Sequence, residues 1–206
     1  MRNTLTAAEQ NIFQSLDTPH KIQDFLNTLK RKKGSGEPIV RSPRLVLQER
    51  SANCMEGALL AAAVLMHHGK RPFLLDLRIG SKIKNDSDHV VTLFKEQGCW
   101  GALSKTSHAV LRYREPIYKN MRELAPSYFH EYFTDDGKKN LRSFSKPYDV
   151  KKHFKTAWVT SEDDQYEIAA ALDDSPHTSI LTKHMEKNLR RADRIEIAAG
   201  KLTERP

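Results

Sequence analysis

The feature that most constrains the fold of this chain is an apolar segment from Cys54 to about His68. Its residues are apolar on nearly all sides of a helix, and Gly69 follows as a C-terminal stop. Because a helix that is apolar on every side must be buried, the segment predicts a core helix surrounded by other elements. Its longest apolar run, residues 58–66, is far shorter than the roughly 20 residues that cross a bilayer, so no membrane partner is expected.

The length and composition suit one globular domain. The chain has 206 residues, of which 38% are hydrophobic and 29% charged, and we expect a single domain over residues 1–206. The first residues show no apolar core of a signal peptide, which favours a cytoplasmic location. In that reducing compartment the two cysteines, Cys54 and Cys99, are expected to be free thiols.

Hydrophobic periodicity and turn residues predict an α+β fold. Helices are expected over residues 6–16, 18–29, 54–68, 127–133, 161–172 and 178–199, with a short turn or helix after Ser42-Pro43 and a loop over 33–38. Strands are expected over residues 72–79, 88–94 and 99–103, with a further extended segment over 109–113. We therefore expect the cysteine-bearing helix to pack on a small antiparallel sheet, with additional helices before and after it.

Two residues in this arrangement carry chemistry. Cys54 stands at the first turn of the apolar helix, where the positive end of the helix dipole favours a thiolate. His89 follows on a strand, in Asp88-His89-Val90-Val91, and a histidine from elsewhere in the fold is the usual base for a cysteine nucleophile. The chain is therefore a candidate cysteine hydrolase or acyltransferase.

The order of these residues resembles the transglutaminase-like superfamily of papain-fold enzymes, and more closely its bacterial transglutaminase-like domain proteins of undefined function. The resemblance is carried by Cys54-Met55-Glu56-Gly57-Ala58, Asp88-His89-Val90-Val91, Gly98-Cys99-Trp100-Gly101-Ala102 and the segments 111–118 and 127–133. It implies a papain/transglutaminase-like core over about 18–133. The part from Asp149 onward matches no part of the family, and its periodicity predicts a C-terminal helical extension over about 150–206. The resemblance also implies that Cys54 is the nucleophile and His89 the general base.

The position of the third catalytic residue departs from the family pattern. That residue normally follows the strand tryptophan by four positions and is Asp, whereas here Trp100 leads to Ser104. A serine can accept a hydrogen bond from the histidine, but it brings no negative charge to stabilise an imidazolium. Three alternatives follow: the group that orients the histidine comes from another segment, catalysis is weak, or the fold serves another purpose.

An oxyanion hole would combine the backbone amide of Cys54 with one side-chain donor. Gln48 precedes Cys54 by six residues, a spacing that papain-like enzymes use for a glutamine donor, and Asn53 is the nearer candidate. Glu56 faces away from Cys54 on the helix, and we expect it to pair with a buried arginine, either Arg112 or Arg114.

The favoured function is a cysteine-dependent amide-bond enzyme that hydrolyses a peptide or isopeptide, or transfers an acyl group, through a thioester. The alternative is a weakly active or inactive transglutaminase-like module that binds a peptide or an acidic partner. Acidic partners are considered because residues 151–206 hold ten of the 34 Lys/Arg and ten of the 26 Asp/Glu, so the +8 excess lies in residues 1–150.

Other classes of ligand find little support in the sequence. Adjacent His67 and His68 diverge on a helix and have no ligand cluster around them, Cys99 reads as a packing residue, and no metal site is expected. Glycine-rich phosphate loops and nucleic-acid motifs are lacking, so neither a cofactor nor a nucleic acid is expected. The sequence predicts no oligomeric state.

Overall fold

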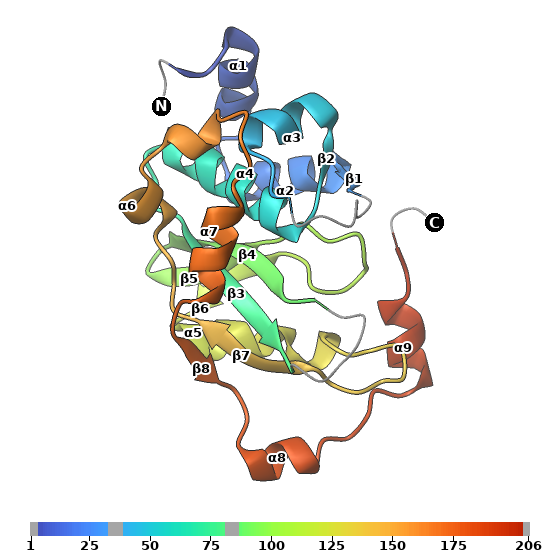
Figure 1. Cartoon of the computed structure of the whole chain (residues 1–206). Coiled ribbons are helices and arrows are strands. Elements are labelled where there is room, and N and C mark those ends of the chain that lie inside the picture. Colours follow the sequence, from blue (N-terminus) through green and yellow to red (C-terminus); the bar gives the residue numbers. More distant parts are fainter. Residues whose placement is uncertain (1–3, 33–38, 81–86, 204–206) are drawn as a thin grey trace.

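The structure is a computed structural model that describes residues 4–32, 39–80 and 87–203 (Figure 1). An antiparallel sheet runs through its middle in the order β6-β5-β4-β3-β7-β8. Its strands are β3 (Phe73–Ile79), β4 (His89–Glu96), β5 (Cys99–Leu103), β6 (Arg114–Tyr118), β7 (Leu141–Ser145) and β8 (His177–Ser179). A short parallel pair, β1 (Lys30–Arg31) and β2 (Ser51–Ala52), lies apart from this sheet. The loop expected over 33–38 lies outside the described residues.

Helices cover both faces of the sheet (Figure 1). One face of the sheet packs against the N-terminal helices, and the opposite face packs against the helical segment of residues 121–131. The helices are α1 (Ala7–Ser15), α2 (Pro19–Thr28), α3 (Pro43–Glu49), α4 (Cys54–His67), α5 (Met121–Leu124), η2 (Ala125–Glu131), α6 (Val150–Phe154), η3 (Ala157–Val159), α7 (Tyr166–Asp173), α8 (Lys183–Lys187) and α9 (Arg194–Gly200).

The strand β4 shows why the central strands are apolar on both faces. Val90 belongs to the core cluster around α4, whereas Val91 belongs to the cluster around η2. Successive side chains of a strand point to opposite faces, so a strand that is covered on both sides has two apolar sets of residues. The mixed helix and antiparallel-sheet architecture expected from the sequence is therefore present.

Helix α4 is buried along nearly its whole length, as its composition predicts. The Asn53 side chain caps its first turn by accepting from the Glu56 amide, and the Glu56 carboxylate accepts from the Asn53 amide. Gly57 lets the chain after β5 approach closely, since a Cβ there would lie 2.4 Å from the Cβ of Lys105. The start of α4 and the end of β5 are thus held against each other.

The segment over 109–113, expected to be extended, does not form a regular strand. Strand β6 begins only at Arg114, and Leu111 has a φ of 61°, in the left-handed region that a β-strand does not use. The sequence Ala-Val-Leu-Arg-Tyr fits an extended segment locally, but the tertiary contacts of Leu111 hold its backbone in the left-handed conformation. The expected helix over 127–133 is instead the 3₁₀ helix η2, which ends at Glu131.

The C-terminal region is less helical than its periodicity predicts. The helix expected from Ser161 begins at Tyr166, and the helix expected over 178–199 is replaced by β8, α8 and α9. Strand β8 pairs with β7, a strand that the sequence analysis did not identify, and Thr182 and Asp193 each start a separate short helix. A pairing between residues so far apart in sequence leaves no local signal, and here it overrides a helical apolar pattern.

Two further findings concern the cysteines and the membrane. Cys54 and Cys99 are both free thiols, as expected. Among the described residues, no helix combines the length and the apolar character that crossing a bilayer requires.

Candidate active site

Cys54 stands at the first residue of α4, facing a cleft of about 880 Å³. The cleft is also lined by Asn53, His89, Lys105 and the segment around His108. The sulfur lies 4.0 Å from the carbonyl oxygen of Asp88, the residue before His89. Helix α4 and the start of β4 therefore bring the predicted nucleophile and the predicted base to one cleft.

The imidazole of His89 is held by Ser104, the residue at the predicted third position. The two side chains lie 2.8 Å apart, from His89 Nε2 to Ser104 Oγ. The Ser104 hydroxyl donates its own hydrogen to the Leu111 carbonyl, at 2.5 Å. Since a hydroxyl has a single hydrogen, Ser104 Oγ must accept from His89, and Nε2 carries the proton of the neutral ring. The lone pair of Nδ1 is then the basic site.

The Leu111 carbonyl supplies part of what the serine lacks. It accepts from Ser104 and also favours the charged form of His89, raising the pKa of the imidazole against the larger opposing effect of burial. A carbonyl dipole in a buried site can stabilise a nearby positive charge in place of a carboxylate. Ser104 thus connects the histidine to a backbone acceptor.

Glu131 fixes the backbone that presents this carbonyl. Its Oε2 accepts from the Leu111 amide at 2.8 Å and forms an ion pair with Arg114 Nη2 at 2.8 Å. The left-handed φ of Leu111, 61°, is unfavourable for a leucine, so surrounding contacts must maintain it. Sequence reasoning did not find Glu131 because a non-glycine left-handed residue has no signature in a single sequence.

Gln23 anchors the Ser104 main chain from the other side. Its Oε1 accepts from the Ser104 amide at 2.9 Å and its Nε2 donates to the Ser104 carbonyl at 2.8 Å. This two-way contact with a buried glutamine of α2 holds the main chain of Ser104 in place. Gln23 is a second residue of the site that the sequence did not indicate.

The charge states differ from the expectation of a thiolate favoured by the helix dipole. Burial raises the pKa of the Cys54 thiol, and this effect exceeds the opposing effect of the Val90, Met55 and Cys54 amides. Burial also lowers the pKa of His89 to about 4. At neutral pH both groups are therefore uncharged at rest. The helix dipole acts in the predicted direction, but removal of water from the sulfur has the larger effect.

Of the two side-chain candidates for the oxyanion hole, Asn53 lies at the cleft and Gln48 does not. Gln48 is not among the residues that line the cleft, because α3 buries the face containing Pro43 and Val46 and leaves position 48 exposed. Asn53 does line the cleft, with its side-chain oxygen engaged in capping α4. The Cys54 amide lies in the first turn of α4, where amides have no partner within the helix.

Glu56 pairs with an arginine, but not with either of the two expected. Its carboxylate bonds Arg41 at 2.8–3.1 Å and Lys32 at 3.0 Å, while Arg114 bonds Glu131. The arginine lies in the segment before α3, which reaches the start of α4 only in the folded chain. This buried pair holds the N-terminal turn that carries the cysteine.

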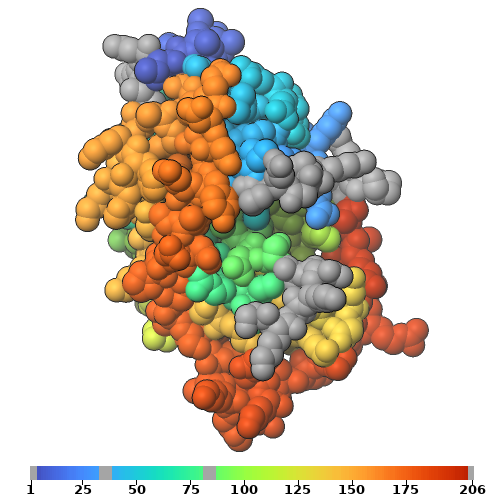
Figure 2. All heavy atoms as spheres, in the orientation of Figure 1, coloured from blue at the N-terminus to red at the C-terminus, as the bar shows by residue number. Residues whose placement is uncertain are grey.

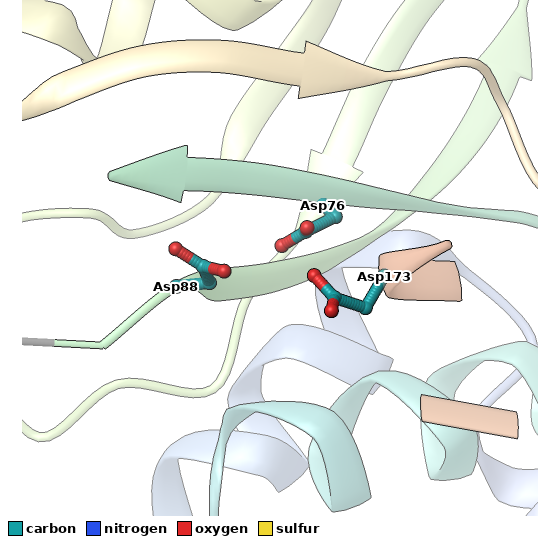
Figure 3. A group of neighbouring side chains, drawn as sticks. All are labelled: Asp76, Asp88 and Asp173. Atoms are coloured by element: carbon teal, nitrogen blue, oxygen red, sulfur yellow. The ribbon is translucent and has the colours of Figure 1, made fainter. Parts of the chain in front are cut away.

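Three carboxylates gather beside the site, at Asp76, Asp88 and Asp173 (Figure 3). One oxygen of each lies within 4.8 Å of the others, a spacing that a single cation can bridge. The guanidinium of Arg78 lies 3.8 Å from Asp76 and 4.0 Å from Asp88, and pairs with Asp173 at 2.5 Å. His177 adds a contact of 3.1 Å to Asp76. The positive charge of Arg78 therefore lies beside all three carboxylates.

Comparisons with known proteins give a distant and partial similarity. No family model matches the sequence, and no curated protein matches it. Among solved structures, Legionella pneumophila LapG is similar at 14% identity and a TM-score of 0.36, over 46% of this chain and 59% of that one. The EGTA-treated form of Legionella pneumophila LapG gives 14% identity and a TM-score of 0.37, over 46% and 57%. The matched part is less than two thirds of either LapG chain.

Proposed function

We propose that this protein is a cysteine-dependent amide-bond enzyme with a papain/transglutaminase-like core, using Cys54 as nucleophile and His89 as base. The observation that carries the proposal is a chain of two hydrogen bonds: His89 Nε2 donates to Ser104 Oγ, and Ser104 Oγ donates to the Leu111 carbonyl. This arrangement leaves Nδ1 as the basic nitrogen in a cleft that Cys54 also lines.

The proposed reaction proceeds through a thioester. His89 Nδ1 takes the thiol proton as the sulfur bonds to the amide carbon, and the resulting oxyanion accepts a hydrogen bond from the backbone amide of Cys54. The C–N bond then breaks and the leaving amine takes the proton from the imidazolium. Water or an amine attacks the thioester next, with Nδ1 accepting its proton and returning it to the sulfur. Water gives hydrolysis, and an amine gives acyl transfer.

The neutral resting state makes a specific kinetic prediction. A neutral base with a pKa of about 4 is fully available above about pH 5, so acylation of Cys54 should be nearly independent of pH from 5.5 to 8. An unassisted thiol with a raised pKa should instead react about tenfold faster for each pH unit over this range, because only its thiolate attacks.

The test is acylation by p-nitrophenyl acetate in a Cys99→Ser background, with release of p-nitrophenol and the mass of the acetylated protein as readouts. We expect a flat pH profile in the parent protein and a tenfold rise per pH unit in the His89→Ala variant. Acetylation should disappear in the Cys54→Ala variant. A parent profile that rises as steeply as that of His89→Ala contradicts a role of His89 as base.

A binding module is the second candidate, favoured by Ser104 in place of a carboxylate and by the neutral charge states of the pair. In that case no acetyl-enzyme forms above the rate of an ordinary thiol. Peptide binding would then be retained in the Cys54→Ala variant.

A further inference from the structure

The short strand β1 lies beside the segment that leads into the cysteine helix (Figure 1). It pairs in parallel with β2, and Arg31 stands opposite Ala52, two residues before the cysteine. The Lys30 amide donates to the Arg50 carbonyl at 3.0 Å, and the Lys32 amide donates to the Ala52 carbonyl at 3.3 Å. Because the residues on both sides of Arg31 are bonded to the neighbouring segment, the position of Arg31 beside the start of α4 is fixed.

This position brings Arg31 within reach of the nucleophile. Neighbouring strands lie about 4.8 Å apart and two residues of extended chain span at most about 7 Å, so the Cα atoms of Arg31 and Cys54 are no more than about 12 Å apart. Both residues line the cleft, and the Arg31 side chain is exposed. The guanidinium at the end of this long side chain can therefore reach a group that is bound beside the sulfur.

The cleft is bordered by residues from both ends of the chain, among them residues 31, 32, 197, 200 and 201. In the space-filling view, blue atoms of the N-terminal part and red atoms of the C-terminal part both reach the surface on the right-hand side (Figure 2). A substrate that enters the cleft therefore meets side chains from β1 as well as those of the C-terminal region.

The guanidinium of Arg31 has neither a hydrogen bond nor an ion pair within the part of the chain that the structure describes. Several other charged side chains of the cleft wall have a partner of opposite charge: Lys32 pairs with Glu56 at 3.0 Å, Lys138 with Asp136 at 3.1 Å, Lys201 with Asp135 at 3.8 Å and Glu131 with Arg114 at 2.8 Å. The carboxylates of the cleft wall are thus matched by their own cations, and none of them is the partner of Arg31.

The charges around the start of α4 leave an excess of positive charge. Three cationic side chains, Arg31, Lys32 and Arg41, stand there with two carboxylates, Glu49 and Glu56. Both carboxylates are already engaged by Arg41 and Lys32. The unmatched charge is therefore that of Arg31, and it lies at the cleft.

We propose that Arg31 is a specificity residue that binds a carboxylate of the substrate close to the amide bond that Cys54 attacks. An arginine presents its N–H groups in a planar fork that matches the two oxygens of a carboxylate, and such charge-assisted pairs are strong hydrogen bonds. The carboxylate belongs to an Asp or Glu side chain or to the C-terminus of a peptide. The proposal rests on the proposed function only in taking Cys54 as the residue that the substrate reaches. It assigns to one residue the acidic preference considered from the net charge of the chain.

Alkylation of the Cys54 thiol tests the proposal without requiring turnover. N-iodoacetylglycine and N-iodoacetylglycinamide have the same reacting carbon, and only the first carries a carboxylate, which imitates a peptide C-terminus. The N-iodoacetyl derivatives of aspartic acid α-amide and asparagine amide form a second pair, with the carboxylate on a side chain. Rate constants are measured from the mass of the alkylated full-length protein in a Cys99→Ser background. Rates with N-acetylcysteine amide, a neutral thiol, correct for the intrinsic difference between the reagents.

At pH 7.5 and low ionic strength we expect the anionic reagent of at least one pair to react about fivefold faster than its neutral partner, and less so in 0.5 M NaCl. The pair that shows the preference identifies the source of the carboxylate. Arg31→Gln should abolish the preference and leave the rates of the neutral reagents unchanged. Arg31→Lys should retain part of it, because the charge remains while the planar fork is lost. Lys30→Gln, which removes the same charge from a neighbour that does not line the cleft, is the matched control and should keep the preference.

Equal corrected rates within both pairs, or a preference that Arg31→Gln leaves intact, overturns the proposal. An equal loss in Lys30→Gln also overturns it, because the effect would then come from the general field of the chain. Unchanged rates with the neutral reagents show that the fold around Cys54 is kept. If p-nitrophenyl acetate does not acylate Cys54 while the Arg31-dependent preference holds, the proposed enzyme function falls and the carboxylate site stands. If acylation succeeds without any preference, the carboxylate site falls alone.

Discussion

Replacing His89 by glutamine should change how the stability of the protein depends on pH. The imidazole is buried, with a pKa of about 4 against an ordinary value of 6.5. Between pH 6.5 and 4 the unfolded chain therefore binds a proton at this residue and the folded chain does not. The free energy of unfolding must fall as the pH falls through this range, and above pH 6.5 the residue has no such effect.

The size of the effect follows from the two pKa values. A tenfold difference in proton affinity corresponds to about 1.4 kcal/mol, so the difference between 6.5 and about 4 amounts to roughly 3 kcal/mol. His89→Gln keeps a donor for Ser104 but cannot take up the proton. Relative to this variant, the wild-type protein should lose roughly 3 kcal/mol of stability between pH 7 and pH 4.

The assay is urea unfolding followed by tryptophan fluorescence at half-unit steps from pH 4 to pH 7.5. The free energy of unfolding of the variant is subtracted from that of the wild type at each pH, which cancels the contributions of the carboxyl groups. His130→Gln, on an exposed side chain of η2, is the matched control and should give a flat difference. A flat difference for His89→Gln as well would refute the idea that burial keeps this imidazole neutral.

Three further substitutions probe the network around the site. Glu131→Gln keeps the shape but removes the charge beside Leu111, and we expect acylation to slow about tenfold while unfolding in urea changes by about 1 kcal/mol or less. Ser104→Ala removes the group that accepts a hydrogen bond from the imidazole, so the flat pH profile of acylation should become a tenfold rise per pH unit. The free energy of unfolding should fall by about 1–3 kcal/mol. An unchanged pH profile would mean that the serine does not orient the base. Gly57→Ala places a Cβ 2.4 Å from the Cβ of Lys105 and should lower the free energy of unfolding by about 1–3 kcal/mol. An unchanged free energy of unfolding in urea would show that the start of α4 and the chain after β5 separate easily.

Several elements could be predicted because their signals are local. The apolar composition of α4 and the proline after Thr18 and Ser42 mark helices whatever the rest of the chain does. The strands β3, β4 and β5 are short, mostly apolar segments separated by polar and turn residues, a pattern typical of strands. These are the elements that bring Cys54 and His89 together.

The errors fall where the deciding contacts are distant in sequence. The apolar residues after position 177 fit one long helix, but residues 177–179 pair with β7 as an edge strand and the stretch that follows contains two short helices, α8 and α9. The residues over 109–113 fit an extended segment, but contacts with Glu131 and Ser104 hold Leu111 in the left-handed conformation. A one-dimensional pattern cannot indicate which of two locally acceptable conformations gains the tertiary contacts.

The amino-acid sequence by itself determined that a cysteine stands at the start of a buried helix and that a histidine begins a strand of the adjoining sheet. Those properties follow from side-chain periodicity and capping, which act over a few residues. Only the tertiary structure decided that Ser104 and the Leu111 carbonyl orient the imidazole, that the Cys54 thiol and the His89 imidazole are neutral at rest, and that residues 202 and 203 pair with the loop of His108 and Ala109. The direction of hydrogen bonds, desolvation and strand pairing depend on which groups are in contact in the folded chain, and these contacts join residues that are far apart in the sequence.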